Sequence, residues 1–261
     1  MMSSMIIVVV VIMLETLIKA ARAAGEIQKK HYGNKINIES KGKNGIVTQA
    51  DKEAEEIILS VLNEKYNYGV VAEESGTAYN ESEYYWVIDP IDGTTNYSRQ
   101  IPFFCVSIAL FKHDQPEAAV IYQPLSDELF YARKNQGAYM NDKQLLRGEP
   151  EEPVLIDCNK GRGKRAKDKY LKALEHIPDV YTDTVIFGSS ALELAYLASG
   201  RVDCFITYGD ELYDVAAGIL IARETGCLVS NWNGNPWTPD DPDLVVAPPK
   251  LHNELVGYLS A

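Results

Sequence analysis

The stretch Trp86-Val-Ile-Asp-Pro-Ile-Asp-Gly-Thr-Thr-Asn-Tyr97 is the most informative part of this 261-residue chain. An apolar, strand-like run ends at Asp89, Pro90 stiffens the backbone, and Asp92 follows three residues after Asp89. Two carboxylates with a carbonyl between them suit Mg²⁺, because this hard cation takes oxygen ligands in near-octahedral geometry. Gly93 lets the backbone approach a ligand closely, and the amides that follow could point at phosphate oxygens. The stretch therefore predicts a loop that holds a metal ion and an anion together.

A surface turn is the alternative interpretation of this stretch, because Asp, Pro, Gly, Thr and Asn are common turn residues. The apolar run that feeds the turn argues against it, since burial would bring two uncompensated carboxylates near the core at considerable cost. Further acids also favour a metal site. Glu73 and Glu74 follow a second strand-like run, in which neighbouring side chains point to opposite faces, so we expect only one of them to face the cleft. Asp51 and Asp214 each begin a predicted helix, where each could instead act as a capping acid.

The charge balance limits the partners of the chain. It carries 25 basic and 37 acidic residues, a net charge of −12, which argues against a general nucleic-acid or anionic-membrane surface. Any phosphate that it handles then needs a bound cation. The basic run at 160–169 is either a solvated loop leading into a helix or a guide for an anionic substrate. The four cysteines and four histidines are dispersed, so we expect reduced thiols in a cytoplasmic protein and no zinc site.

The chain begins with an apolar run that we set apart from the rest. Met5–Leu14 is about half the length of a membrane-spanning helix and lacks the basic start of a secretory signal. An amphipathic helix is expected from Met13 to about Gln28. We therefore interpret residues 1–12 as an N-terminal extension or loosely packed arm, with a membrane anchor as the alternative.

The rest of the chain divides at the proline-rich stretch Gly148–Pro153. Residues 13–150 contain two helical patterns followed by consecutive strands, which predicts an α+β lobe that carries the acidic motifs. Residues 151–261 alternate strand and helix patterns, which predicts an α/β lobe that completes the active site.

Four segments of the chain resemble the inositol monophosphatase family, a branch of the lithium-sensitive, Mg²⁺-dependent phosphatases. They occur in the family's order and approximate spacing, and the resemblance covers the chain from Met13 to the C-terminus. The segments are Val47-Thr48-x-x-Asp51, Glu73-Glu74-Ser75, Trp86-x-x-Asp89-Pro-Ile-Asp-Gly-Thr-Thr-Asn96 and Asp214-x-Ala-Ala-Gly218. The resemblance implies a five-layer αβαβα sandwich of the sugar-phosphatase type, a homodimer, and two to three Mg²⁺ ions, for which Mn²⁺ is a possible substitute.

The resemblance also implies roles for individual residues. One ion would be held by Glu73, Asp89 and the carbonyl of Ile91, and a second by Asp89, Asp92 and Asp214, with a weaker third ion near Glu73. Thr94 with Asp51 would activate the attacking water. The amides of Gly93, Thr94 and Thr95 would bind the phosphate.

Departures from the family pattern concern the substrate. Animal members carry Trp where this chain has Tyr213, a sugar-binding Glu where it has Thr207, and an acid where it has Gly45. Substrate contacts are expected at Gly188, Ser189, Thr207 and Asp210. The expected substrate is a small polyol or sugar phosphate, inositol 1-phosphate or fructose 1,6-bisphosphate. The alternatives are histidinol phosphate and 3′-phosphoadenosine-5′-phosphate, or, in another class, a regulatory protein associated with RNA or transcription.

Overall fold

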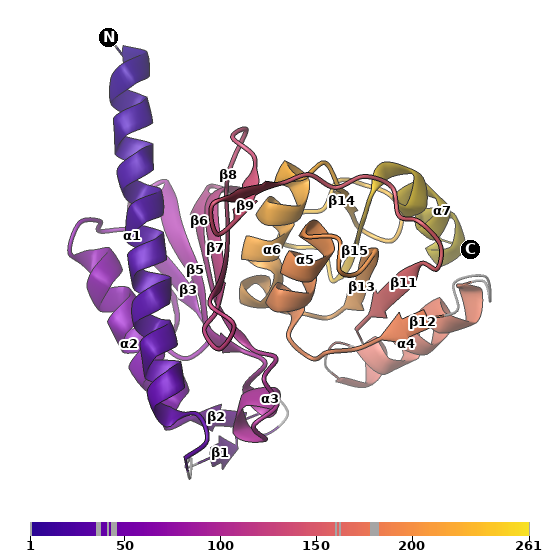
Figure 1. Cartoon of the computed structure of the whole chain (residues 1–261), viewed down its shortest axis with the longest axis horizontal. Coiled ribbons are helices and arrows are strands. Elements are labelled where there is room, and N and C mark those ends of the chain that lie inside the picture. The colour runs from indigo at the N-terminus through magenta and orange to yellow at the C-terminus, as the bar shows by residue number, and fades with distance from the viewer. Residues whose placement is uncertain are drawn as a thin grey trace.

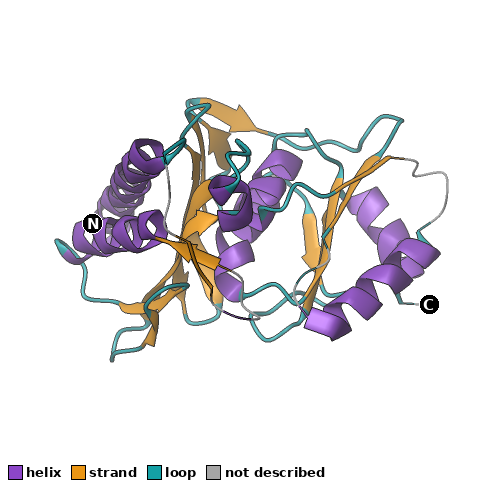
Figure 2. Ribbon diagram, turned by 90° about the horizontal axis from the view of Figure 1, so that it is seen from below, coloured by secondary structure: helices purple, strands orange, loops and turns teal. Residues whose placement is uncertain are grey.

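Two β-sheets alternate with three layers of helices (Figures 1 and 2). The computed structural model describes residues 2–34, 38–40, 42, 46–159, 161, 163–177 and 183–260. From one side to the other, the layers are α1 with α2, the first sheet, α5 with α6, the second sheet, and α4 with α7. The predicted αβαβα sandwich is confirmed.

The helices differ widely in length. They are α1 Met2–His31, α2 Gln49–Asn63, α3 Thr94–Ser98, α4 Gly163–His176, α5 Ser190–Ala198, α6 Leu212–Glu224 and α7 Pro249–Leu259. The strands are β1 Ile38–Ser40, β2 Ile46–Thr48, β3 Gly69–Ala72, β4 Gly76–Ala78, β5 Tyr84–Asp92, β6 Cys105–Lys112, β7 Gln115–Gln123, β8 Glu128–Arg133, β9 Ala138–Met140, β10 Lys143–Leu145, β11 Leu155–Cys158, β12 Asp183–Val185, β13 Cys204–Tyr208, β14 Leu228–Ser230 and β15 Asp243–Ala247.

Helices cover both faces of the first sheet, which has the strand order β10-β9-β8-β7-β6-β5-β3-β4 in the described part of the chain. Trp86 and Ile88 pack in a cluster with residues of α1 and α2, whereas Val87 packs with residues of α5 and α6. This alternation follows the two-residue period of a strand. Strand β5 is apolar over most of its length because both of its faces are buried.

The second sheet has the order β12-β11-β13-β15-β14. Strands β12, β11 and β13 are parallel, and β15 and β14 run antiparallel to their neighbours. Its outer face packs against α4 and α7, and its inner face against α5 and α6. The predicted junction at 148–153 lies between β10 and β11, but α5 and α6 pack on both sheets, so the two predicted lobes share a core.

Helix α1 is longer than the sequence pattern predicts. Its backbone is helical from Met2, whereas the expected start was Met13. Extending an existing helix costs less free energy than nucleating one, which accounts for an earlier start. From Met13 onward, α1 buries an apolar stripe against the first sheet, and Figure 1 shows its N-terminal end projecting beyond that sheet. No helix in the described part of the chain is long and apolar enough to cross a membrane.

The contact between α5 and α6 gives a test of the central layer. A Cβ atom added at Gly218 would lie 2.4 Å from Cβ of Leu194, so the two helices pack with no room for a methyl group. We predict that Gly218→Ala lowers stability by about 2 kcal/mol and the melting temperature by about 5 °C, because overpacking forces the helices apart.

Gly257 provides the matched control. It lies in α7, and a Cβ atom there would meet no atom within 4 Å. Gly257→Ala should raise stability by about 0.5 kcal/mol through helix propensity alone. Thermal unfolding of both variants checks the pair, and a Gly218→Ala protein as stable as the parent would contradict the packing argument.

Candidate functional site

A β-bulge at the end of β5 brings Asp89 and Asp92 to the same side of the first sheet. Asp89 pairs with Ser107 and Asp92 with Cys105, so three steps along β5 oppose two along β6. Without the bulge, residues three apart would point to opposite faces. The extra residue turns Asp92 toward the layer that contains α5 and α6, the same face on which Asp89 lies.

Asp214 joins these two acids from the start of α6. Carboxylate oxygens of Asp89, Asp92 and Asp214 lie within 4.8 Å of one another, and all three residues are buried. Asp214 also accepts a hydrogen bond of 2.8 Å from the backbone N–H of Glu211, so it closes a capping box. The sequence left helix capping and metal binding as alternative roles for Asp214. The position of its side chain is compatible with both roles.

Hydrogen bonds hold Asp92 in place. Its Oδ2 accepts from the Ser189 hydroxyl at 2.6 Å and from the Ala191 N–H at 2.7 Å. Ser189 is 1% exposed and does not line the cleft, although it was expected to contact substrate. The structure places Ser189 behind Asp92, where its hydroxyl orients a carboxylate of the candidate metal site.

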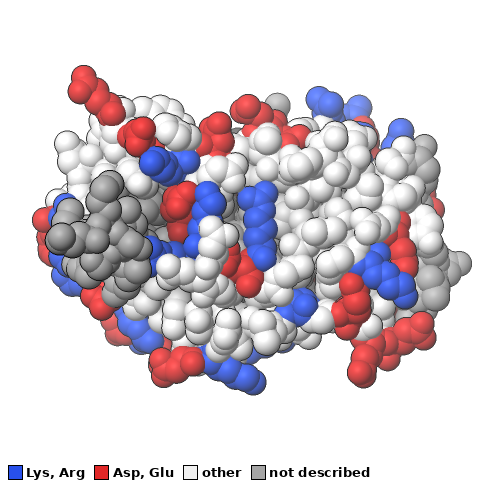
Figure 3. Space-filling model, turned by 90° about the horizontal axis from the view of Figure 1, so that it is seen from above, with Lys and Arg blue, Asp and Glu red and all other residues white. Residues whose placement is uncertain are grey.

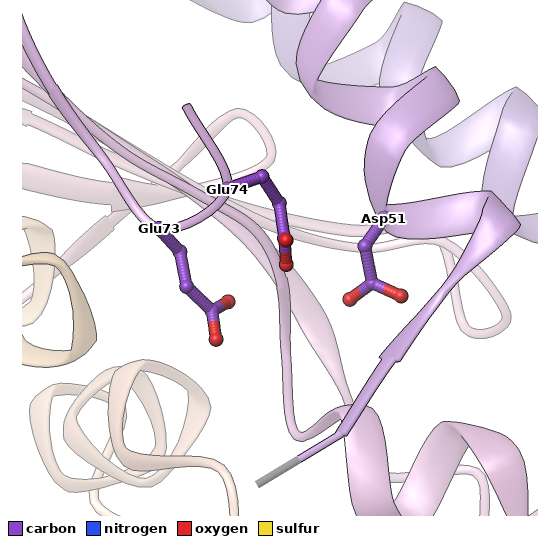
Figure 4. Close-up of side chains that lie close together, drawn as sticks. All are labelled: Asp51, Glu73 and Glu74. Atoms are coloured by element: carbon purple, nitrogen blue, oxygen red, sulfur yellow. The ribbon is translucent and has the colours of Figure 1, made fainter. Parts of the chain in front are cut away.

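Asp51, Glu73 and Glu74 form a second group of acids (Figure 4). Their carboxylate oxygens lie within 4.8 Å of one another. Of the two glutamates only Glu73 lines the cleft, as expected, but Glu74 does not point away from Glu73, because both residues lie in the turn between β3 and β4, where strand alternation does not apply. The buried Glu55 fixes this turn by accepting hydrogen bonds from the N–H groups of Glu74 and Ser75, at 2.9 and 2.8 Å. Sequence reasoning missed Glu55, which lies one helical turn after Asp51 on the same face of α2.

Asp51 is linked to the loop after β5. Its Oδ2 accepts from the N–H and the hydroxyl of Thr48, at 2.8 and 2.5 Å, which completes the capping box of α2. The Thr94 hydroxyl lies 3.2 Å from Oδ1 of Asp51 and 3.0 Å from the carbonyl oxygen of Ile91, and can donate to either. Thr94, Asp51 and Ile91 therefore meet as the sequence analysis expected.

Burial and mutual repulsion make these acids poor anions in the absence of a cation. Burial, together with the neighbouring acids, raises the pKa of Asp51 to about 7, that of Asp92 to about 6, and that of Asp89 well above its usual value. A divalent ion would neutralise this repulsion and supply the partners that buried carboxylates need. The all-oxygen donor set fits a hard cation such as Mg²⁺.

The loop after β5 forms one edge of a cleft of about 280 Å³. Gly93 adopts φ +90°, and a Cβ atom there would lie 3.0 Å from the carbonyl oxygen of Phe103. Glycine therefore fits both the left-handed backbone and the close approach. The cleft is lined by Ile46, Glu73, Asp89, Ile91, Asp92, Gly93, Thr94, Thr95, Asn96, Asn159, Gly161, Gly188, Ser190, Asp210 and Asp214.

Gly188 and Asp210 line this cleft as expected for substrate contacts, but Thr207 does not. Thr207 is 2% exposed in the middle of the second sheet, and its side chain borders a separate cavity of about 20 Å³. It lies on the inner face of β13, which α6 covers. Ser190, in the segment where substrate contacts were expected, lines the cleft at the start of α5, whereas sequence reasoning missed Asn159, which lines it just after β11.

The chain is similar to known proteins over nearly its whole length. Residues 12–261 match the inositol monophosphatase family. The Nus factor SuhB of Pasteurella multocida is 36% identical over 95% of each protein, and the inositol-1-monophosphatase of Mesorhizobium japonicum is 36% identical over 94% of each. A crystal structure of the extragenic suppressor protein suhB from Bartonella henselae matches with a TM-score of 0.88 at 32% identity, over 95% of this chain and 98% of that one.

The raised pKa values predict how stability depends on pH in the metal-free protein. Burial raises the pKa of Asp157 to about 9 and of Glu193 and Asp51 to about 7, so the folded state keeps protons that the unfolded chain has released. Stability should therefore fall as pH rises from 6.5 to 8, by on the order of 2 kcal/mol or about 5 °C. Thermal unfolding in EDTA measures this, and a melting temperature that is flat or rises over that range would contradict it. The buried His252, whose pKa burial lowers, opposes this trend only weakly above pH 6.5, because the unfolded chain has by then released about half of its proton at this residue.

Proposed function

Because the chain belongs to the inositol monophosphatase family and is thus a phosphoric monoester hydrolase, we propose that it hydrolyses a small polyol or sugar phosphate with Mg²⁺. The observation that carries this proposal is that Glu73, Asp89, Asp92 and Asp214 line one cleft beside the Gly93–Thr95 loop, with carboxylate oxygens of Asp51 and Glu74 within 4.8 Å of one of Glu73. Acids in this number serve a metal-dependent reaction, and the loop adds amide donors for an anion.

The acids divide into sets that suit separate ions. Asp89, Asp92 and Asp214 form one set. Glu73 lies close enough to Asp89 to raise the pKa of Asp89, and these two acids would share a second ion. The group of Asp51, Glu73 and Glu74 suits the weaker third ion, with Mn²⁺ as an alternative to Mg²⁺. When bound, such ions polarise the phosphoryl group, lower the pKa of a water and stabilise the leaving alkoxide.

The chain's own residues position the reactants. The Thr94 hydroxyl, held between Asp51 and the Ile91 carbonyl, can orient a water for attack, and Asp51 can take its proton. The amides of Gly93, Thr94 and Thr95 are in place to donate to phosphate oxygens. The reaction needs no covalent nucleophile, which agrees with the burial of all four cysteines.

The size of the cleft favours a small leaving group. A volume of about 280 Å³ suits inositol 1-phosphate or a hexose phosphate better than 3′-phosphoadenosine-5′-phosphate, which also carries a base. The proposal includes inhibition by Li⁺, a homodimer and a cytoplasmic location, as the family resemblance implies.

A binding role is the second candidate, because several relatives, among them those of Pasteurella multocida and Vibrio cholerae, are named Nus factors. The same fold would then serve RNA or transcription machinery. The net charge of −12 argues against direct nucleic-acid binding, and acidic and basic side chains are interspersed on the face shown in Figure 3. Copurification with nucleic acid, together with no turnover of any phosphomonoester, would favour this role over catalysis.

Replacing one acid of the candidate metal site tests the catalytic proposal. We predict that Asp92→Asn lowers kcat/KM for inositol 1-phosphate by two or more orders of magnitude, about 3 kcal/mol, because it removes one charge from the metal set. The amide oxygen of Asn keeps an acceptor for the Ala191 N–H, so the fold should survive. Asp142→Asn, in the exposed turn between β9 and β10, is the matched control. Full activity of Asp92→Asn would sink the assignment.

Metal binding itself has a readout that does not depend on turnover. We predict that Mg²⁺ at about 100 times its Kd stabilises the protein by about 2.7 kcal/mol, because only the folded chain assembles the carboxylates. The melting temperature should rise by several degrees, and Asp214→Asn should reduce that rise. The absence of any shift with Mg²⁺ or Mn²⁺ would count against the metal site.

A further inference from the structure

A second cavity lies on the outer face of the second sheet. It has a volume of about 360 Å³ and opens between α4 and α7, the two helices of the outermost layer (Figure 1). Lys169 and Lys172 line it from α4, Trp232 and Asn233 from the turn after β14, and Leu259 from the end of α7. We call it the α4–α7 cavity. None of the residues described as lining it also lines the acidic cleft, so the two are separate.

Trp232 gives the cavity a fixed aromatic base. The residue is 5% exposed, and its ring packs edge-on against Tyr208, with 5.7 Å between the ring centroids. Its indole N–H donates to the carbonyl oxygen of Leu244 at 3.3 Å, and its backbone N–H donates to the Asp243 carboxylate at 2.8 Å. Ala173, which is 2% exposed, also lines the cavity and fills little of it. The base is therefore apolar and held in one position.

Lys169 is placed differently from the other described basic residues of α4. It is half-buried, whereas the others are exposed: Lys164, Arg165, Lys167 and Lys172. Its Nζ lies 5.8 Å from the ring centroid of Trp232 and 5.9 Å from that of Tyr208, within range of cation–π attraction. An ammonium group on an aromatic surface has lost part of its water, so it attracts an anion more strongly than an ammonium group in bulk solvent does.

The charges around the cavity favour an anion. Lys172 follows Lys169 by three residues and thus lies on the same face of α4. Two acids lie nearby. Glu175 is exposed, and the Asp243 carboxylate accepts the N–H of Trp232. Burial raises the pKa of Asp243, and the charge of Lys169 acts in the opposite direction, which places the ammonium group on the inner side of α4. In a chain of net charge −12, seven of the residues from 160 to 172 are Lys or Arg. The solvated-helix interpretation of this basic run holds for its exposed members but not for Lys169.

We propose that the α4–α7 cavity is a second ligand site, which binds a small organic anion by its phosphate or carboxylate head group at Lys169 and Lys172. The apolar or aromatic body of the ligand would pack on Trp232 and Leu259. Phosphate and carboxylate share this chemistry, because both present oxygen acceptors to ammonium groups. A volume of about 360 Å³ lies within the range of small-molecule sites. The inference does not rest on the proposed phosphatase function, because the site uses none of the acids of the candidate metal site.

Four compounds separate the contributions of head group and body. Phenyl phosphate carries both parts, methyl phosphate has the head group without the ring, benzyl alcohol has the ring without the charge, and benzoate replaces phosphate by carboxylate. Titrations in EDTA prevent metal-dependent hydrolysis. The readout is the indole N–H signal of Trp232 in the NMR spectrum of isotope-labelled protein, identified by its loss in Trp232→Phe. The signals of Trp86 and Trp237, which do not line the cavity, serve as internal references.

We expect phenyl phosphate to shift the Trp232 signal saturably, with a Kd on the order of 1 mM. Methyl phosphate and benzyl alcohol should each bind about tenfold more weakly or worse, because each lacks one of the two contacts. Tighter binding of phenyl phosphate than of benzoate identifies phosphate as the preferred head group, and the reverse order identifies carboxylate.

Variants of α4 assign the binding to the cavity. Lys169→Gln keeps most of the aliphatic stem and removes the charge, so it should weaken phenyl phosphate binding about tenfold. Lys169→Arg keeps the charge and should bind within about threefold of the parent. Lys167→Gln is the matched control, because it removes an exposed charge from the same helix outside the cavity, and it should leave the Kd unchanged. Unshifted reference signals of Trp86 and Trp237 show that each variant is folded.

Three results would overturn the site. The first is a Trp232 signal that does not respond to phenyl phosphate at concentrations up to about 20 mM. The second is equal affinity for benzyl alcohol and phenyl phosphate, which identifies an apolar cavity without charge recognition. The third is a folded Lys169→Gln protein with the affinity of the parent. Each of these leaves the proposed phosphatase function standing, and a failure to hydrolyse any phosphomonoester leaves the α4–α7 cavity proposal standing.

Discussion

The repulsion among carboxylates in one buried cleft is the constraint on which the rest of the site depends. Within each of two groups of three acids, carboxylate oxygens lie within 4.8 Å of one another, and Asp214 comes from the second half of the chain. Taking such groups out of water costs several kcal/mol each unless a partner compensates, and none of the described residues that line the cleft is a lysine or an arginine. The fold therefore has to hold acids in positions that they would leave if the backbone were free. The rigidity comes from the two sheets and the central helix pair, whose contacts leave no room at Gly218.

Four of the acids, Asp51, Asp89, Asp92 and Asp214, accept a hydrogen bond from a backbone N–H group, which offsets part of the cost of their burial. Asp51 and Asp214 occupy equivalent positions in the capping boxes of α2 and α6, and each accepts a hydrogen bond from the backbone three residues before it. The positive end of the helix dipole favours a carboxylate at these positions. Asp92 takes its N–H partner from Ala191, at the start of α5. Helix capping therefore helps to hold the acids of the candidate metal site. One carboxylate can serve both as a helix cap and as a metal ligand.

The sequence predicts the parts of this arrangement that depend on local pattern. The apolar run before Asp89, the helix starts at Asp51 and Asp214 and the layered fold follow from periodicity, turn residues and the family resemblance. The approach of the Glu74 carboxylate to that of Glu73 could not be predicted, because the end of β3 is set by pairing with β4, which is not a local property. Ser189 and Thr207 were expected at the cleft. Ser189 is instead buried behind Asp92, and Thr207 lies on the face of β13 that α6 covers. Asp157 and Glu193 carried a signal that was overlooked, since a lone acid within an apolar strand or helix is costly without a purpose.

One short segment connects the two sides of the cleft. Ser189 and Ala191 hold Asp92, while Gly188 and Ser190, beside and between them in the chain, line the cleft. Glu193 accepts the amides at the start of this segment, and its own N–H donates to the Ser189 carbonyl. A change at Gly188 or Ser190 therefore reaches Asp92 through at most a few bonds. One short segment thus fixes both one side of the cleft and one acid of the candidate metal site, so the shape of the cleft and the position of Asp92 depend on the same backbone.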